Sequence, residues 1–359
     1  MKYDIIIVGS DLTAATIAAL NKDKKILILE RGEIGGLHRT ENYNGIDVHK
    51  YGANIFHTSS RFIWDFINSQ SSVNIMNNYR HRVKAMTDGY IRSFPINLQT
   101  YSDLYNIDEP SIMEDSLDDP FYADNYEDYL IDKLGVDLYD KFYAHYSLKK
   151  WGIPPKLLPS FLAKEIPVRS SYNDEYYDDL YQGVPTFGYT SLIEDMTSHC
   201  DVQHTEFLAD REYIEKMGKL IIYTDAIDEY FAYEHGQLPY RTAEYRMSFE
   251  PVKDFQGTAI MRYCDHSVQF TRIIEHKHFN HAESDVTITT TEYPRMYKVG
   301  SEYKRILPIP LGANEDLYSR YLDQSDEKVI FAGIIGSYSL MDLADCVSQG
   351  FNINDKYIR

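Results

Sequence analysis

Uninterrupted apolar runs mark the strands of a parallel sheet in this chain. Residues 4–8 and 25–30 are such runs, and their lack of alternation indicates strands that are buried on both faces. Residues 13–20 lie between them and have a helical composition, so the start of the chain predicts a β-α-β unit. Two later runs, residues 219–224 and 328–333, predict further strands of the same sheet. The predicted fold class is α/β, with a Rossmann-like dinucleotide-binding domain assembled from separate parts of the chain.

The segments between these strands carry other patterns. Residues 79–95 predict a strand pair around an Asp-Gly turn, and residues 240–294 are dominated by strands. Residues 124–134 and 136–149 have helical spacing. We therefore expect an inserted helical lobe and an antiparallel sheet lobe. The predicted boundaries are 1–75, 190–238 and 325–359 for the Rossmann-like domain, 100–165 for the helical lobe, and 76–99, 166–189 and 239–324 for the sheet domain.

The turn after the first strand departs from the dinucleotide-binding fingerprint. That motif places glycine at positions 9, 11 and 14, whereas this chain has Gly9, Asp11 and Ala14. The second glycine lets the backbone approach a pyrophosphate, and Asp11 puts a side chain and a negative charge there. Two like charges ~4 Å apart repel by roughly 4 kcal/mol at an intermediate dielectric. Glu30 still ends the second strand, where this fold holds a ribose hydroxyl.

Composition narrows the classes of function. The chain has 359 residues and 43% hydrophobic content, which suits two or three lobes with real cores. Its net charge of −19 argues against broad, non-specific binding to nucleic acid or an anionic membrane. We expect a soluble, cytoplasmic protein, because neither a membrane-spanning run nor a signal peptide is evident. Cys200, Cys264 and Cys346 lack metal spacing and predict free thiols and no metal site.

Several short motifs follow one another in a fixed order. They are residues 50–58 (KYGANIFHT), 93–97 (SFPIN), 149–152 (KKWG), 166–169 (IPVR), 181–185 (YQGVP), 188–190 (GYT), 270–279 (FTRIIEHKHF) and 291–294 (TEYP). Together they resemble the flavin-dependent UDP-galactopyranose mutases, from Lys2 to about Asp342. The resemblance implies a reaction without net redox: reduced FAD attacks the anomeric carbon, UDP leaves and returns, and the sugar recloses as a five-membered ring.

The resemblance also implies a binding site for a UDP-sugar in the sheet domain. Arg169 and Arg272 match the two family arginines that hold the diphosphate, where fixed positive charge stabilises a leaving group. Further substrate-binding candidates are Trp151 and Asn97, which match sugar-side and flavin-side positions, and Tyr181, which suits the nucleotide. Tyr303, or alternatively Arg305, would replace hydroxyl groups that bind the diphosphate in the family. The residues left to bind the cofactor are Gly9, Glu30, Gly35, Gly36 and Asp342.

The positions that would contact the flavin differ from the family pattern in several places. Asp11 and Ala14 replace glycines, and Asn54 replaces a histidine near the flavin ring. Ile334 replaces an arginine, and residues 340–341 replace a pair of tyrosines. All of these changes fall on one ligand. We therefore expect that FAD has been lost and that no cofactor is bound, with reduced FAD as the alternative.

Three functions follow from these observations. The first is a UDP-sugar-dependent glycosyltransferase that passes galactose or arabinose to an acceptor hydroxyl, with His57, Glu292 or Asp11 as general base. A modified DNA base is one acceptor that this hypothesis allows, although the net charge opposes it; the phosphate contacts would be Arg80, Arg82, Lys149 and Lys150. The alternatives are an FAD-dependent UDP-galactopyranose mutase and a non-catalytic UDP-sugar-binding protein. The family resemblance adds a homodimer as an expectation.

Overall fold

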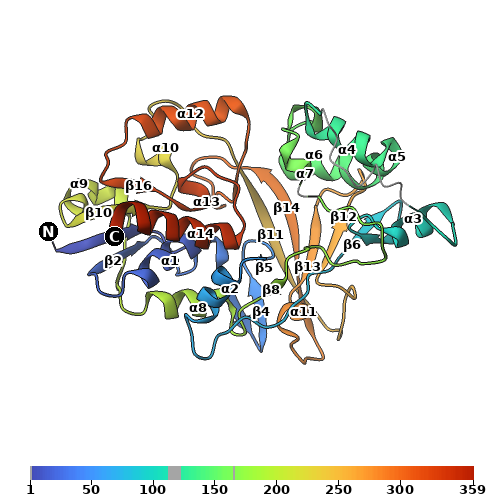
Figure 1. The fold of residues 1–359 in the computed structure, drawn as a ribbon, viewed down its shortest axis with the longest axis horizontal. Helices are drawn as coiled ribbons and strands as arrows, with labels where there is room; N and C mark the ends of the chain where they lie inside the picture. Colours follow the sequence, from blue (N-terminus) through green and yellow to red (C-terminus); the bar gives the residue numbers. More distant parts are fainter. Residues whose placement is uncertain (1, 112–122, 165) are drawn as a thin grey trace. The chain divides into compact units, whose positions relative to one another are not determined.

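The computed structural model describes residues 2–111, 123–164 and 166–359. Its contacts divide the chain into two units (Figure 1). The first comprises Met1–Tyr79, Asp179–Tyr240 and Lys304–Arg359, and the second comprises Arg80–Asp178 and Arg241–Tyr303. The segment predicted as a separate helical lobe, residues 100–165, thus shares a unit with the antiparallel sheet. Residues 112–122 and 165 of that lobe lie outside the described residues.

A parallel sheet of five strands in the order β16-β10-β1-β2-β9 forms the centre of the first unit. The strands are β1 (Tyr3–Val8), β2 (Ile26–Glu30), β9 (Asp201–His204), β10 (Gly218–Tyr223) and β16 (Val329–Phe331). Ile6, Ile7 and Ile222 have no exposed surface, which explains the apolar runs without alternation. The β1 and β2 strands pair in parallel with Val8 opposite Leu29, so their carboxyl ends meet at one edge of the sheet.

Helix α1 (Leu12–Leu20) packs against both α8 (Gly188–Thr197) and α14 (Leu343–Ile353), as Figure 1 shows. One buried cluster contains residues of all three helices, among them Leu12 and Val347. This packing fixes the N-terminus of α1 after the end of β1. The other elements of the unit are α2 (Arg61–Asn68), α9 (Arg211–Glu215), α10 (Ile227–Tyr230), α12 (Gly312–Asp323), α13 (Gly333–Gly336), β3 (Thr40–Tyr43), β4 (Ile46–His49), β5 (Phe56–Thr58), β8 (Tyr181–Gly183) and β15 (Leu307–Pro308).

The second unit contains a mostly antiparallel sheet, in which the strands follow the order β11-β14-β13-β12-β6-β7. Only β12 and β6 pair in parallel within this series. The strands are β6 (Val83–Thr87), β7 (Tyr90–Phe94), β11 (Tyr240–Glu250), β12 (Ile260–Tyr263), β13 (Arg272–Glu275) and β14 (Thr287–Met296). With the parallel sheet of the first unit, this sheet confirms the α/β fold class that the sequence predicted.

The helices of the second unit are α3 (Leu98–Tyr105), α4 (Tyr126–Leu134), α5 (Val136–Tyr139), α6 (His145–Trp151), α7 (Phe161–Lys164) and α11 (Lys277–Asn280). Helix α6 ends at Gly152, which has a φ of 66° in the left-handed region. A side chain at this position would also meet the Arg241 guanidinium, since a Cβ would lie 2.5 Å from Nη1. The Trp-Gly motif therefore stops the helix where Trp151 is packed into the core.

Candidate functional site

The turn between β1 and α1 brings together the residues predicted to bind the ribose side of a dinucleotide. Gly9 has a φ of 94°, and a Cβ there would lie 2.1 Å from Thr224 Oγ1, so the position requires glycine. Ser10 Oγ donates to Glu30 Oε2 at 2.5 Å and accepts from the Gly35 amide at 3.0 Å. These bonds fix the Glu30 carboxylate at the end of β2. Gly9, Glu30, Gly35 and the neighbouring Gly36 lie together in this turn region.

Two backbone amides in the first turn of α1 already donate hydrogen bonds to side chains of the protein. Asp11 is the N-cap, and its Oδ1 accepts from the Ala14 amide at 2.8 Å. The Leu12 amide donates to His38 Nδ1 at 3.2 Å. Burial lowers the pKa of His38 to about 4, so the ring is neutral and can accept this bond. Burial, together with the negative charges of Asp225 and Glu30, raises the pKa of Asp11 to about 6.

A bound pyrophosphate would normally accept from these helix N-terminal amides. Here the Asp11 carboxylate occupies the Ala14 amide and lies against Gly333, where an added Cβ would be 2.1 Å from Asp11 Oδ2. The ribose side thus fits a dinucleotide. The phosphate turn does not fit one while Asp11 caps the helix.

His57 lies between two carboxylates of the first unit. Its Nδ1 is 2.7 Å from Asp179 Oδ2, and its Nε2 is 3.7 Å from Asp342 Oδ2. Asp342 is also the N-cap of α14 and accepts from the Asp345 amide at 2.7 Å. Burial raises the pKa of Asp342. The structure therefore brings His57 and Asp342 together, two residues that the sequence had assigned to different roles.

The candidate Tyr181, and Asn54 at the position of a family histidine, both have local structural contacts in the first unit. The Tyr181 ring stacks on Trp64, with ring centroids 5.4 Å apart and planes inclined by 18°. The Asn54 side chain donates to the Leu37 carbonyl, and its backbone amide donates to His49 Nδ1. These contacts fix both residues within the fold. A role of Tyr181 in binding the nucleotide stays a prediction.

Three charged side chains form a row across the sheet of the second unit. Arg262 on β12 lies directly opposite Arg272 on β13, and Arg272 lies opposite Glu292 on β14. Directly paired residues of antiparallel strands project from the same face of a sheet. We call Arg262, Arg272 and Glu292 the charged row. Arg272 and Glu292 were candidates from the sequence and Arg262 was not, because the register that joins the three is visible only in the folded sheet.

Arg272 and Glu292 form an ion pair within the charged row. Arg272 Nε and Nη2 donate to Glu292 Oε2 at 3.0 and 2.7 Å, and Thr271 Oγ1 donates to Oε1 at 2.7 Å. Although burial acts in the opposite direction, Arg272 and Thr271 lower the pKa of Glu292. The carboxylate is therefore ionised and engaged, which makes it a poor general base. Its evident effect is to fix the Arg272 guanidinium.

The remaining substrate candidates occupy separate places in the second unit. Arg169 donates to the carbonyl oxygens of Glu175 and Tyr176 and to the Asp178 carboxylate. Among the described residues, no contact joins Arg169 to Arg272. Asn97 is fully buried and caps α3, while Trp151 is 4% exposed. The Tyr303 ring lies 5.9 Å from the Arg295 guanidinium.

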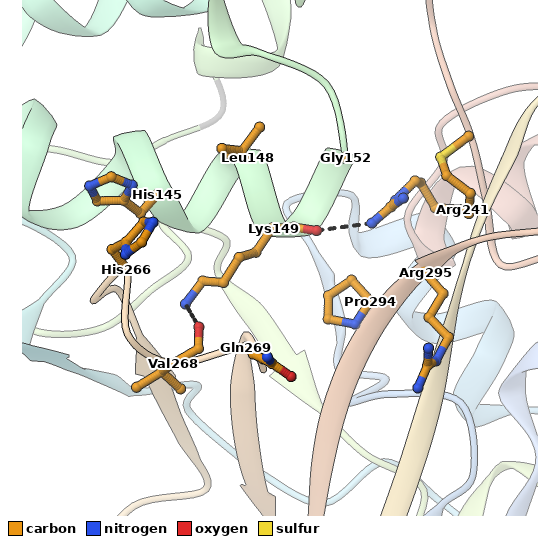
Figure 2. Close-up of a pocket in the computed structure, with 11 residues that line it drawn as sticks. His145, Leu148, Lys149, Gly152, Arg241, His266, Val268, Gln269, Pro294 and Arg295 are labelled. Atoms are coloured by element: carbon orange, nitrogen blue, oxygen red, sulfur yellow. Dashed lines mark hydrogen bonds between the residues drawn. The ribbon is translucent and has the colours of Figure 1, made fainter.

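A cavity of about 440 Å³ lies beside α6 in the second unit (Figure 2). Its lining is rich in basic groups, including His145, Lys149, Arg241, His266 and Arg295. Lys149 Nζ donates to the carbonyl oxygens of residues 263, 265, 268 and 270 at 2.7–3.2 Å. Arg241 donates to the carbonyl oxygens at the end of α6. Lys149 and Arg241 therefore both bond to backbone carbonyl oxygens of the protein.

One cluster in the described part of the chain has the composition of a metal site, Asp254, Glu275 and His278, with ligand atoms within 4.8 Å of one another. Glu275 accepts from the amides of Phe255 and Gln256, and Asp254 accepts from the Gly257 amide. These bonds indicate that the carboxylates hold the loop of residues 254–257.

Comparison with known families agrees with this architecture. The family model described as UDP-galactopyranose mutase matches residues 141–340, which is more than half of the chain. The chain belongs to the UDP-galactopyranose mutase family. A second model, described as an NAD(P)-binding Rossmann-like domain, matches residues 7–69. The mutase match includes Trp151, Arg169 and the whole charged row, and the Rossmann-like match includes the turn at Asp11.

Individual relatives extend over nearly all of this mutase-family chain. It is 29% identical to dTDP-fucopyranose mutase of Escherichia coli, with 99% of this chain and 98% of that protein aligned. It is 30% identical to a protein of Klebsiella pneumoniae named "Probable UDP-galactopyranose mutase", with 99% and 94% aligned. A crystal structure of reduced UDP-galactopyranose mutase superposes with a TM-score of 0.74 at 12% identity, covering 98% of this chain and 95% of that one, which shows the shared fold.

These findings correct the first functional hypothesis. The relatives are named mutases, so the prediction of a glycosyltransferase is wrong. The DNA acceptor belonged to that hypothesis alone and is withdrawn with it. Arg80 and Arg82, proposed as DNA contacts, pair with Glu175 and Asp174. The expected loss of the cofactor gains no support, because the Rossmann-like domain is retained. No helix in the described ranges is long and apolar enough to span a membrane. The homodimer and the cytoplasmic location stay predictions.

Proposed function

We propose that this mutase-family chain interconverts the pyranose and furanose forms of a sugar linked to a pyrimidine nucleoside diphosphate. The observation that carries the proposal is the alignment with the Klebsiella relative over 99% of the chain. A similar identity to the dTDP-fucopyranose mutase leaves UDP and dTDP as the two nucleotides to test. UDP-galactose is the first substrate to try, since both the family and the sequence motifs point to it.

The charged row supports this proposal chemically. When the bond to the anomeric carbon breaks, negative charge develops on the departing diphosphate. Arg272 is held through Nε and Nη2 by Glu292, and its Nη1 donates to no described residue. A fixed guanidinium with a free edge suits a phosphate oxygen, because it needs little reorganisation when the charge appears. In this proposal Arg272 binds the diphosphate and Glu292 orients Arg272.

The cofactor implied by the family resemblance is reduced FAD. Glu30, Gly35 and Gly36 are the residues proposed to hold its ribose side. Because the phosphate turn does not fit a pyrophosphate while Asp11 caps α1, we assign no reaction step to the cofactor. His57, held between Asp179 and Asp342, is proposed as a residue near the sugar.

The direct test is turnover of a nucleotide sugar. The purified protein is incubated with FAD and dithionite, and then with UDP-galactopyranose or dTDP-fucopyranose. We expect a new furanose product, which liquid chromatography separates from the pyranose, and no product with the Arg272→Gln variant. Binding of UDP without any conversion would contradict the mutase and favour a non-catalytic nucleotide-sugar-binding protein.

A further inference from the structure

Arg262 is a buried cation that pairs with no carboxylate in the described ranges. It is 8% exposed on β12, and its Nε has no hydrogen-bond partner in this part of the chain. No hydrogen bond or ion pair joins its Nη atoms to any residue that the structure describes. Its guanidinium carbon lies 3.8 Å from the centroid of the Tyr146 ring and 4.2 Å from that of Phe94. The rings hold the guanidinium in place but give its buried Nε no acceptor among the described residues.

The surroundings of Arg262 add to this imbalance. Arg272 lies directly opposite on β13, and like charges at paired positions destabilise a sheet. The nearby carboxylate of the charged row, Glu292, is already bonded to Arg272. Lys150 on α6 lies over the Trp151 ring. Burial and then repulsion by Arg272 and Arg262 lower its pKa to about 8, so its ammonium adds to the positive field around the two arginines. Three cations therefore face one carboxylate.

Unpaired buried charge is costly for a folded protein, and it persists where a ligand supplies the counter-charge. With Arg262, Arg272 and Lys150 protonated and Glu292 ionised, the group carries a formal charge of about +2. A diphosphate diester carries two negative charges and several acceptor oxygens, which match this excess. The Arg272 side chain is 26% exposed, so the group is open to solvent.

We propose that Arg262 is a substrate-binding residue that, together with Arg272 and Lys150, binds the diphosphate of the nucleotide sugar. This inference rests on the proposed function for the class of substrate. It deepens that function by adding a residue on β12 to the diphosphate site. Tyr146 and Phe94 position the Arg262 side chain.

The experiment measures binding of UDP and of uridine to the full chain by titration calorimetry, with thermal unfolding in parallel. Arg262→Met keeps the length of the side chain but removes its charge and donors. We expect it to weaken UDP binding about ten- to a hundredfold, leave uridine binding unchanged, and leave the Tm of the free protein unchanged or higher. Arg262→Lys, which keeps the charge, is expected to retain part of the UDP affinity.

The matched control is Arg246→Met. Arg246 is on the same sheet and lies 4.3 Å from the Tyr293 ring centroid, but it is exposed and pairs with Glu244. We expect its UDP affinity to equal that of the natural chain. Equal losses of UDP and uridine binding in Arg262→Met, or a lowered Tm with UDP affinity intact, would overturn the inference. So would a natural chain that binds neither UDP nor dTDP.

The two proposals fail differently. A natural chain that binds UDP through Arg262 but converts no sugar would refute the mutase function and leave the diphosphate site standing. A chain that converts the sugar, and whose Arg262→Met variant binds UDP normally, would refute the diphosphate site alone.

Discussion

The two candidate anion sites of this protein differ in whether the chain satisfies them itself. At the start of α1, Asp11 and His38 take the amides that a pyrophosphate would use. In the charged row, Arg262 pairs with no carboxylate of the described residues, and Arg272 Nη1 donates to none of them. The first site is closed by a negative side chain, and the second carries an excess of positive charge. At the first site a bound anion must displace the Asp11 carboxylate. At the second site a bound anion would neutralise positive charge that the described residues leave unpaired.

The largest expected effect comes from breaking the ion pair of the charged row. Arg272→Gln leaves the Glu292 carboxylate, 12% exposed, without its cation. We expect the free energy of unfolding to fall by about 3 kcal/mol, which urea denaturation would measure. The double variant Arg272→Gln, Glu292→Gln is the control and should recover most of this loss. Full stability of the single variant would show that the pair does not stabilise the fold.

Removing the Asp11 carboxylate should increase the affinity of the phosphate turn for FAD. Asp11→Gly frees the Ala14 amide and removes a negative charge, so we expect FAD to bind at least about tenfold more tightly at pH 7.5. Asp11→Asn keeps a helix cap and removes only the charge, and it should give an intermediate affinity. Quenching of flavin fluorescence measures both. The same FAD affinity in all three chains would show that Asp11 does not obstruct the pyrophosphate.

The smallest expected effect is a pH dependence of stability. The folded pKa of Asp11 is about 6, above its ordinary value of 3.8. Between these values the folded chain keeps a proton that the unfolded chain has lost, so stability falls as the pH rises from 4 to 6. We expect this contribution to change by about 2 kcal/mol between pH 4.5 and 7, visible as a difference between the natural chain and Asp11→Asn in denaturation curves at the two pH values. If the difference in unfolding free energy between the two chains were the same at both pH values, the raised pKa of Asp11 would be contradicted.

Much of the fold could be predicted from local pattern. The parallel strands were evident because burial on both faces leaves an unbroken apolar run, as in β1 and β10. Asp11 stood out because the fingerprint has a fixed spacing. The division into units was harder, since contacts between the helical segment and the sheet depend on packing over long separations in the sequence.

The charged row illustrates what sequence cannot supply. Arg262 lies ten positions before Arg272 and thirty before Glu292, and nothing in those spacings states that the three residues face one another. Only the register of β12, β13 and β14 aligns them. His57 and Asp342 were likewise found separately, and their approach depends on where α14 begins.

The ammonium group of Lys149 has a consequence for how this family member can vary. One side chain gathers four carbonyl oxygens from the segment that leads from β12 to Arg272. Such a segment tolerates substitution of its side chains, because Lys149 bonds only to its backbone carbonyl oxygens. It should not tolerate insertion or deletion, since one residue more or fewer would take carbonyls away from the ammonium and shift the start of β13. The length of this loop is thus fixed by a residue on α6, more than a hundred positions earlier in the chain.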